Sequence, residues 1–514
     1  MSRTRNRPVN PEDWARTAIE KGQYFNNEYA ITGYQRCDGQ GGTILHPACV
    51  VEDELRQTRA RLQAAFPQVK TARLHVKMPS WLQHDPRLPT TYTFVEMPER
   101  LSTASVTIVM VPKTLIKLAQ LRFRFDGPLL PSLKEGLADT NFRGIVGNLG
   151  YFMTERLTSD AFPWSHQMRF PDYPIPSVLS YLGFHLFRNA ANGDAFGAFL
   201  GAHPAAIAKR ADGIVEIIPQ LEIESYRVSL MGHRFEVNSV NDSHTRDEVA
   251  VFTPGLQSAQ VDAHRRSWQH FAPEIPVGDR INLFIANEGN GAIPVERVVS
   301  VWEGRSPLPS FGGVLSFERG YFETVFGTSD SVRLIGREIQ VEPIAGSDLT
   351  HYTELLGGLV PAIIDGQHIY AVGTCVELER QLQRYGNALS PIAECGRESR
   401  NFDPRIREPA GVFAETQDSV GWILFDGRHE LSIGASVADV ASILKKIDCA
   451  NILGEPMLHA VFVDGGSAMK AYYVCGRGNT TDLHLLNRVA AGSRNGPGED
   501  PDGLNLYSVL QLEL

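Results

Sequence analysis

Short runs of β-branched and aromatic residues dominate the chain from about residue 140 onward, and turns rich in Gly, Asn, Asp and Pro separate them. This spacing is typical of strands joined by tight turns. The clearest runs are residues 213–219, 226–230, 248–253, 280–286, 297–302, 313–317 and 331–341, and residues 504–512 form a last one. Few long helical patterns interrupt them. The pattern predicts an α+β fold in which helices pack on a large and mostly antiparallel sheet.

The N-terminal part of the chain has a different texture. Residues 52–65 are charged, with leucines at helical spacing, and predict a helix. Residues 105–111 predict a strand, whereas residues 117–125 alternate too poorly for an assignment. The change of texture near residue 140 predicts an N-terminal accessory region over residues 1–135 and a second domain over residues 140–514.

One late helix can be predicted in detail. Ser436 can cap its N-terminus, and Asp439 three residues later completes a capping-box pattern. Apolar residues follow at the helical period, which gives the helix one apolar face. We expect this face to pack on a sheet that contains residues 422–425 and 460–463.

Both of these predicted strands end in an Asp-Gly pair. Residues 422–425 are followed by Asp426, Gly427 and Arg428, and residues 460–463 by Asp464, Gly465, Gly466 and Ser467. Asp-Gly is a strong signal for a hairpin turn, so the second pair can simply connect to a strand at residues 471–474. Acids and an arginine at neighbouring strand ends can instead form a polar site. We expect the two strand ends to lie close together.

The order of these features resembles the phosphodiester glycosidase domain family, which occurs in many bacterial proteins and includes the enzyme that uncovers mannose 6-phosphate. The family pattern has an arginine motif, a strand ending in Asp-Gly-Arg, a glycine before a helix, a strand ending in Asp-Gly-Gly-Gly-Ser, and a closing Asn-Arg. The corresponding segments here are residues 407–411, 425–428, Gly434, 463–467 and 486–488. Fainter matches are residues 144–152, 251–254 and 313–316.

Several positions depart from the family pattern. Arg407 is followed by Glu and Pro where the family has Thr, Asp464 is followed by two glycines instead of three, and Arg488 is followed by Val489. Leu149 stands where a glycine is usual. These departures are compatible with a divergent substrate, an altered reaction, or a domain that binds without turnover.

The resemblance implies a set of site residues. Asp464 and Asp426 would be the catalytic carboxylates, and Arg407 and Arg428 would grip a phosphate through their guanidinium groups. The further substrate-binding residues would be Gly465, Gly466, Ser467, Asn487, Arg488 and Asn148. The alternatives are structural: a turn aspartate at 464, an ion pair between Asp426 and Arg428, and arginines that brace the sheet edges.

The function implied is that of a hydrolase or transferase acting on a glycosyl phosphodiester or a related phosphorylated sugar-like small molecule, in a biosynthetic setting. In such chemistry an arginine stabilises the phosphate, and a carboxylate acts as base or nucleophile at the anomeric carbon. Two alternatives stay open: a non-catalytic carbohydrate- or nucleotide-binding domain, and an enzyme of another reaction type on the same fold.

Composition narrows the class of partner. The chain has 514 residues and a formal net charge of −10, which argues against nucleic acid or a membrane surface as partner. The six cysteines and fifteen histidines show no metal-binding spacing, so neither a metal nor a cofactor is expected. No apolar run has membrane-spanning length and no signal peptide is visible, so we expect a cytoplasmic address. The sequence leaves open whether the reaction itself requires a metal, and it leaves the oligomeric state open.

Overall fold

The fold was analysed in a computed structural model. The structure describes residues 47–78, 92–95, 103–123, 141–150, 185–188, 195–199, 205–242, 245–253, 278–288, 295–304, 312–345, 349–372, 409–427, 434–463, 469–477, 480–488 and 508–514, and a few shorter stretches and single residues between them.

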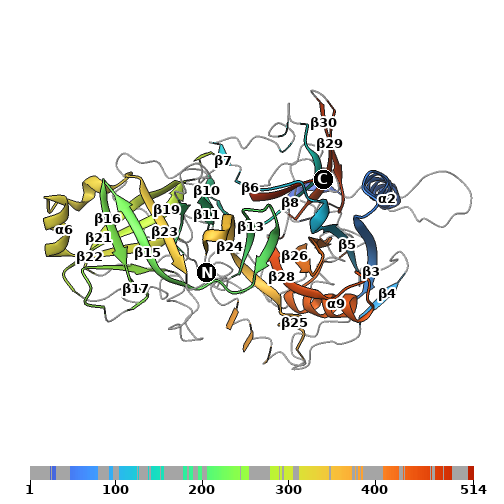
Figure 1. Ribbon diagram of the computed structural model, residues 1–514. Coiled ribbons are helices and arrows are strands. Elements are labelled where there is room, and N and C mark those ends of the chain that lie inside the picture. Colours follow the sequence, from blue (N-terminus) through green and yellow to red (C-terminus); the bar gives the residue numbers. More distant parts are fainter. Residues whose placement is uncertain are drawn as a thin grey trace, which may run out of the picture.

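One large antiparallel sheet, called the central sheet below, runs through most of the described molecule (Figure 1). Its strands, in spatial order, are β16 (His233–Val237), β15 (Ile223–Leu230), β23 (Ile339–Ala345), β12 (Ala195–Gly197), β11 (His185–Arg188), β24 (Tyr352–Ile364), β28 (Met457–Val463), β26 (Ala410–Thr416), β27 (Ser419–Phe425), β5 (Thr103–Pro112), β3 (Lys70–Lys77) and β4 (Thr93–Val95). The long strand β24 also pairs with β13 (Ala205–Arg210), which continues to β14 (Val215–Ile218), and with β25 (Gln367–His368). Strand β24 pairs with β11 and β13 over its first part and with β28 near its end. It therefore joins the half of the molecule that contains β15, β16 and β23 to the half that contains β26, β27 and β28.

Two smaller sheets complete the halves. The first contains β17 (Ser239–Val240), β18 (Val249–Phe252), β22 (Gly313–Glu318), β19 (Arg280–Glu288) and β21 (Val295–Glu303), and helix α6 (Arg319–Phe326) follows β22. The second, called the C-terminal sheet, contains β30 (Thr480–Leu485), β29 (Ala471–Arg477), β8 (Arg143–Asn148), β31 (Ser508–Glu513) and β6 (Leu118–Phe123). Short strand pairs are β1 (Gln23–Tyr24) with β2 (Asn26–Ala30), β9 (Phe152–Thr154) with β10 (Val178–Tyr181), and β7 (Phe125–Asp126) with β20 (Asn290–Gly291). Turns of 3₁₀-helix cover Lys113–Leu115, Ser331–Leu334 and Leu349–His351.

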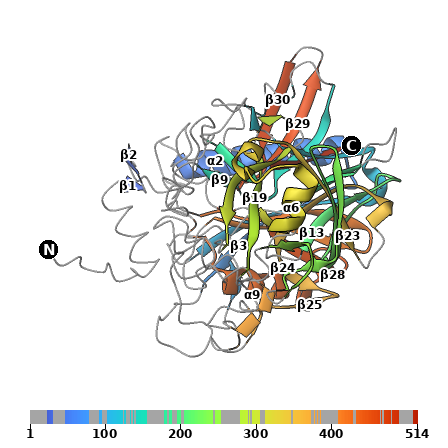
Figure 2. The ribbon, with the colours of Figure 1, turned by 90° about the vertical axis from the view of Figure 1, so that its left-hand side faces the viewer.

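The half that carries the candidate residues is layered. Helix α9 (Val437–Cys449) covers one face of β5, β27, β26 and β28, and its residues share an apolar core with that face. The opposite face packs against the C-terminal sheet and against helix α2 (Pro47–Ala65), in a second core built around Trp422. The end-on view shows α9 at the bottom and the β29–β30 hairpin extending at the top (Figure 2).

The predicted α+β fold with a mostly antiparallel sheet is confirmed. The capping box of α9 forms as the sequence indicates, because the Ser436 hydroxyl accepts from the backbone N–H of Asp439 and the Asp439 carboxylate accepts from the backbone N–H of Ser436. The strand predicted at residues 331–341 is partly wrong. Residues 331–334 form a 3₁₀ turn, and Gly336 at φ 81° ends the irregular segment before β23 begins.

The N-terminal region supplies strands to the central sheet. Strand β5 pairs with β27 over seven positions, from Ser419 opposite Pro112 to Phe425 opposite Val106, and β3 pairs with β5. Strand β6, which the sequence left unassigned, lies at the edge of the C-terminal sheet beside β31. These three strands, β3, β5 and β6, therefore belong to sheets that they share with later parts of the chain. The division into units 1–135 and 140–514 stays a prediction.

No helix among the described residues combines the length and the apolar character that crossing a membrane requires.

A pair of truncations tests how far the N-terminal region belongs to the folding unit. A fragment of residues 140–514 lacks β5, which is buried along almost its whole length, so β27 would expose an unpaired edge and both apolar cores would open. We expect this fragment to be insoluble or to lack a cooperative thermal transition, whereas residues 47–514 should keep both. Size-exclusion chromatography and circular dichroism melting measure this. A soluble 140–514 fragment with a cooperative transition would show that the unit begins near residue 140.

Candidate functional site

The two Asp-Gly strand ends lie at the same edge of the central sheet. Strand β26 lies between β27 and β28, and Gly411 pairs with Leu424 on one side and Val463 on the other. Two interstrand spacings, about 10 Å, therefore separate the ends of β27 and β28. The expectation that these two strand ends lie close together is confirmed for the described residues.

Glycines allow the backbones to approach at this edge. A Cβ atom on Gly427 would lie 2.6 Å from the Pro409 nitrogen, and one on Gly465 would lie 2.7 Å from the Pro409 carbonyl oxygen. Real Cβ atoms do not approach other atoms so closely, so both positions require glycine.

The segment after β28 does not form a hairpin with β29. Strand β28 belongs to the central sheet and β29 to the C-terminal sheet, so the chain crosses between the two sheets over residues 464–470. The interpretation of Asp464-Gly465 as a hairpin turn is therefore wrong. Asp464, Gly466 and Ser467 themselves lie outside the described residues, and their roles stay predictions.

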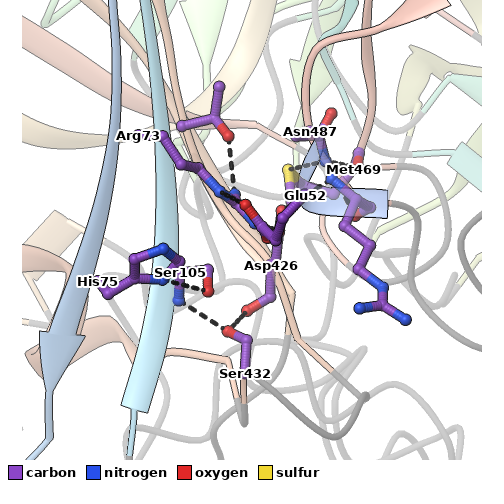
Figure 3. Close-up of polar contacts among 10 residues, drawn as sticks. Glu52, Arg73, His75, Ser105, Asp426, Ser432, Met469 and Asn487 are labelled. Carbon is purple, nitrogen blue, oxygen red and sulfur yellow. Dashed lines mark hydrogen bonds and ion pairs between the residues drawn. The ribbon is translucent and has the colours of Figure 1, made fainter. Parts of the chain in front are cut away.

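Asp426 is completely buried at the end of β27, where it lies in a network of polar contacts (Figure 3). Its Oδ2 atom lies 2.6 Å from Nη2 of Arg73, and its Oδ1 atom accepts from the backbone N–H of Arg488 at 3.2 Å. Its backbone N–H donates to the carbonyl of Ser105, and its own carbonyl accepts from the Ser432 hydroxyl. The carboxylate therefore has one orientation.

Arg73 is a site residue that no sequence motif indicated. It lies on β3, and its guanidinium donates from Nε and Nη2 to both carboxylate oxygens of Glu52 on α2, at 3.2 and 2.5 Å. Its Nη1 atom donates to the Thr107 hydroxyl at 2.9 Å. Arg428, for which the sequence left open an ion pair with Asp426, lies outside the described residues. The signal for Arg73 was present: residues 71–76 alternate polar and apolar side chains, as a half-buried strand does.

The site shifts the pKa values of Asp426, Glu52 and Arg73 in different ways. Burial raises the pKa of the Asp426 carboxyl, and the Arg73 guanidinium opposes this shift. Burial acts in the same direction on Glu52, but there the charge and hydrogen bonds of Arg73 prevail and lower the pKa of that carboxyl. The two carboxylates outweigh burial at Arg73 and raise the pKa of its guanidinium. The site thus holds one acid that stays ionised and a second that takes up a proton more readily.

His75 lies on the same strand as Arg73, with its Nδ1 atom 3.0 Å from the Ser105 hydroxyl. Burial and the charge of Arg73 lower the pKa of this imidazole, which favours its neutral form.

Asn487 and Arg488 connect this cluster to the C-terminal sheet. The Asn487 carbonyl oxygen accepts from the backbone N–H of Ala471 at 2.9 Å, and its amide donates to the carbonyls of Met469 and Arg488 at 3.1 and 3.2 Å. Both residues are buried. The closing Asn-Arg motif therefore fixes the entry to β29 and presents the Arg488 N–H to Asp426.

Asn148 lies at the same seam between the two sheets. Its backbone N–H donates to the carbonyl of Lys470, and its carbonyl accepts from the indole of Trp422 at 3.1 Å. A Cβ atom on Gly147 would lie 2.4 Å from the Trp422 ring, so the glycine allows the ring to pack on the strand. Lys470 is completely buried here and is a cation that no sequence motif indicated.

The structure thus brings together Asn148, Asp426, Gly465, Asn487 and Arg488, through Trp422, residues 469–471 and Pro409. Arg407, like Arg428, lies outside the described residues, so its placement stays a prediction. Within the described part of the chain, no group of three or more His, Cys, Asp or Glu side chains could hold a metal ion.

Comparisons with known proteins give a distant likeness of fold. No protein-family model matches the chain, and no curated protein matches it. Among solved structures, an exported protein from Burkholderia pseudomallei aligns with a TM-score of 0.41 and 15% identity, over 80% of this chain and 74% of that one. The catalytic domain of zebrafish N-acetylglucosamine-1-phosphodiester alpha-N-acetylglucosaminidase, auto-inhibited by its pro-peptide, aligns with a TM-score of 0.34 and 10% identity, over 87% of this chain and 84% of that one. These values indicate a distant relationship of fold and do not establish membership of a family.

The expected cytoplasmic address is contradicted by this comparison, because the first of the two structures is named as an exported protein. The cytoplasmic assignment is therefore withdrawn.

Replacing Arg73 with methionine tests the buried ion pair. The variant leaves the Asp426 and Glu52 carboxylates without their shared cation, so we expect a loss of about 3–5 kcal/mol in the free energy of unfolding at neutral pH. Without Arg73, burial holds the pKa of Asp426 in the folded state above its unfolded value. The folded state then binds the proton more tightly, so part of the loss should be recovered as the pH falls from neutral toward the unfolded pKa of an aspartate, about 4. Urea unfolding at neutral pH and at an acidic pH above that value measures this.

Two further variants control the experiment. Arg73→Met/Asp426→Asn removes the more deeply buried of the two unpaired carboxylates and should recover part of the stability at neutral pH, with a weaker pH dependence. Arg56→Met removes an exposed arginine of the same region that pairs with Asp53, and should change stability by no more than about 0.5 kcal/mol. Equal losses in Arg73→Met and Arg56→Met would contradict the role assigned to the buried pair.

Proposed function

We propose that this protein is a hydrolase or transferase that acts on a glycosyl phosphodiester or a related phosphorylated sugar-like small molecule. The observation that carries the proposal is the convergence, at one seam between two sheets, of the end of β28 before Asp464, the fixed carboxylate of Asp426, and the buried Asn487-Arg488 pair. Such a seam combines rigid strand ends with a connecting segment between two sheets, and this combination is typical of ligand-binding and catalytic sites.

The buried environment of Asp426 favours a positioning role over direct attack on substrate. Both of its carboxylate oxygens face cationic or N–H groups, and the side chain is completely buried. In the proposal Asp426 therefore holds Arg73 and the Arg488 backbone in place. Asp464 acts as the base or nucleophile at the anomeric carbon.

The remaining roles concern the phosphate and the sugar. Arg407 and Arg428 would bind the phosphate oxygens through their planar guanidinium groups. Gly465 and Gly466 would let the backbone approach the ligand, as the close contact of Gly465 with Pro409 supports. Ser467, Asn148 and the side chain of Arg488 would supply further polar contacts to a small-molecule substrate.

A binding domain without turnover is the second candidate. Two observations favour it: Arg407 is followed by Glu408-Pro409, and the described carboxylate, Asp426, is sealed from solvent. Both candidates share the phosphate site and differ in whether Asp464 performs chemistry.

The variant Asp464→Asn separates the two candidates. Asn has nearly the same size but cannot act as base or nucleophile, so we expect turnover of a sugar-1-phosphate diester to fall at least about a hundredfold with little change in melting temperature. Turnover and melting are to be measured on the same preparation. Near-normal turnover in a well-folded variant would remove Asp464 from the mechanism.

The chain offers a matched control for this variant. Asp365-Gly366 is an Asp-Gly turn between β24 and β25, with both residues at positive φ and Asp365 largely exposed. Asp365→Asn should leave turnover and melting temperature unchanged. If the wild-type protein binds sugar phosphodiesters but turns over none of them, the binding-domain candidate takes precedence.

Replacing Arg428 with lysine tests the phosphate contact. Lysine keeps the positive charge but loses the planar fork, so KM should rise while the melting temperature changes little. An unchanged KM would exclude Arg428 from the phosphate site.

A further inference from the structure

Helix α2 places two charged residues on the face that it turns toward the central sheet. Glu52 and Arg59 are seven residues apart, which is two helical turns, or about 10 Å along the axis on the same side. Leu55 and Leu62 lie on that side and are buried. Since Glu52 contacts Arg73 directly, Arg59 faces the same cluster from further along the helix.

Arg59 has no carboxylate of its own in this cluster. Arg73 occupies both oxygens of Glu52 and also contacts Asp426. The Nη1 atom of Arg59 is buried and has no hydrogen-bond partner among the described residues. Burial and the charge of Arg73 together lower the pKa of Arg59 to about 10, although Glu52 and Asp426 oppose the shift. A guanidinium in this state carries a positive charge that its surroundings compensate incompletely.

The chemistry of Arg59 indicates an oxyanion as its ligand. Its buried Nη1 atom is a charged donor for which the described residues supply no acceptor. Arg73 and Arg488 are further cations beside Glu52 and Asp426 and influence the pKa values of both carboxyls. An oxyanion would accept from Arg59, and the planar guanidinium matches the geometry of phosphate oxygens.

We infer that Arg59 is a phosphate-binding residue, through which the N-terminal helix α2 contacts the phosphate group of the substrate beside the Arg73–Asp426 pair. That this phosphate belongs to a substrate rests on the proposed function. The presence of a phosphate-binding site at Arg59 is independent of that function.

Equilibrium binding of inorganic phosphate tests this inference without any turnover. Titration calorimetry on the full chain, at constant ionic strength set with potassium chloride, compares the wild type with Arg59→Gln, Arg59→Lys and Arg56→Gln. Arg56 is the matched control, because it is an exposed arginine on the same helix that pairs with Asp53. We expect Arg59→Gln to weaken phosphate binding at least about tenfold, Arg59→Lys to weaken it less, and Arg56→Gln to leave it unchanged. Acetate should bind more weakly than phosphate to the wild type.

Thermal melting without phosphate distinguishes a phosphate-binding role of Arg59 from a purely structural one. Arg59→Gln removes an incompletely compensated cation, so its melting temperature should equal or exceed that of the wild type, as at other sites that trade stability for function. An arginine that only braces the fold would lower the melting temperature on removal.

The outcomes distinguish the inference from the proposed function. Phosphate binding within about twofold of the wild type in Arg59→Gln overturns the inference, as does an equal loss in Arg56→Gln or an absence of phosphate binding to the wild type. Phosphate binding that depends on Arg59, in a protein that turns over no glycosyl phosphodiester, supports the inference and contradicts the proposed enzymatic function.

Discussion

The buried ion pair between Arg73 and Asp426 is the interaction on which this half of the molecule depends. Two charges that leave water need close geometry and further hydrogen bonds, since a buried pair alone does not repay its desolvation. Here both oxygens of Glu52, the Thr107 hydroxyl and the Arg488 N–H supply them. The pair therefore joins helix α2, strands β3, β5 and β27, and the residues that follow β30, and it makes the N-terminal region part of the candidate site.

The layering explains why these polar groups meet where they do. Helix α9 covers one face of the central sheet with apolar side chains, and the C-terminal sheet and α2 cover the other. Trp422 packs against Gly147 and donates to the Asn148 carbonyl, so the two sheets are held in contact beside the strand ends. The polar cluster around Asp426 then lies at the seam where β27 ends beside the C-terminal sheet.

The charged residues of the cluster differ in how far the protein itself supplies their partners. Arg73 and Glu52 satisfy each other and hold Asp426, so they serve the fold and the geometry of the site together. Arg59 is different, because its Nη1 atom is buried and has no hydrogen-bond partner among the described residues. Groups that a ligand satisfies better than the fold does are typical of binding sites.

Local patterns in the sequence determined the α+β class, most strands, the α2 and α9 helices and the two Asp-Gly strand ends, because alternation, helical periodicity and the Ser436–Asp439 capping box act between residues that are close in the chain. Tertiary structure decided the rest. The pairing of β5 with β27 brings Arg73 to Asp426, and the crossing of the chain after β28 excludes a hairpin at Asp464-Gly465. The ionisation of the buried acids follows from burial and from partners distant in sequence, which only the folded chain brings within reach of their charges.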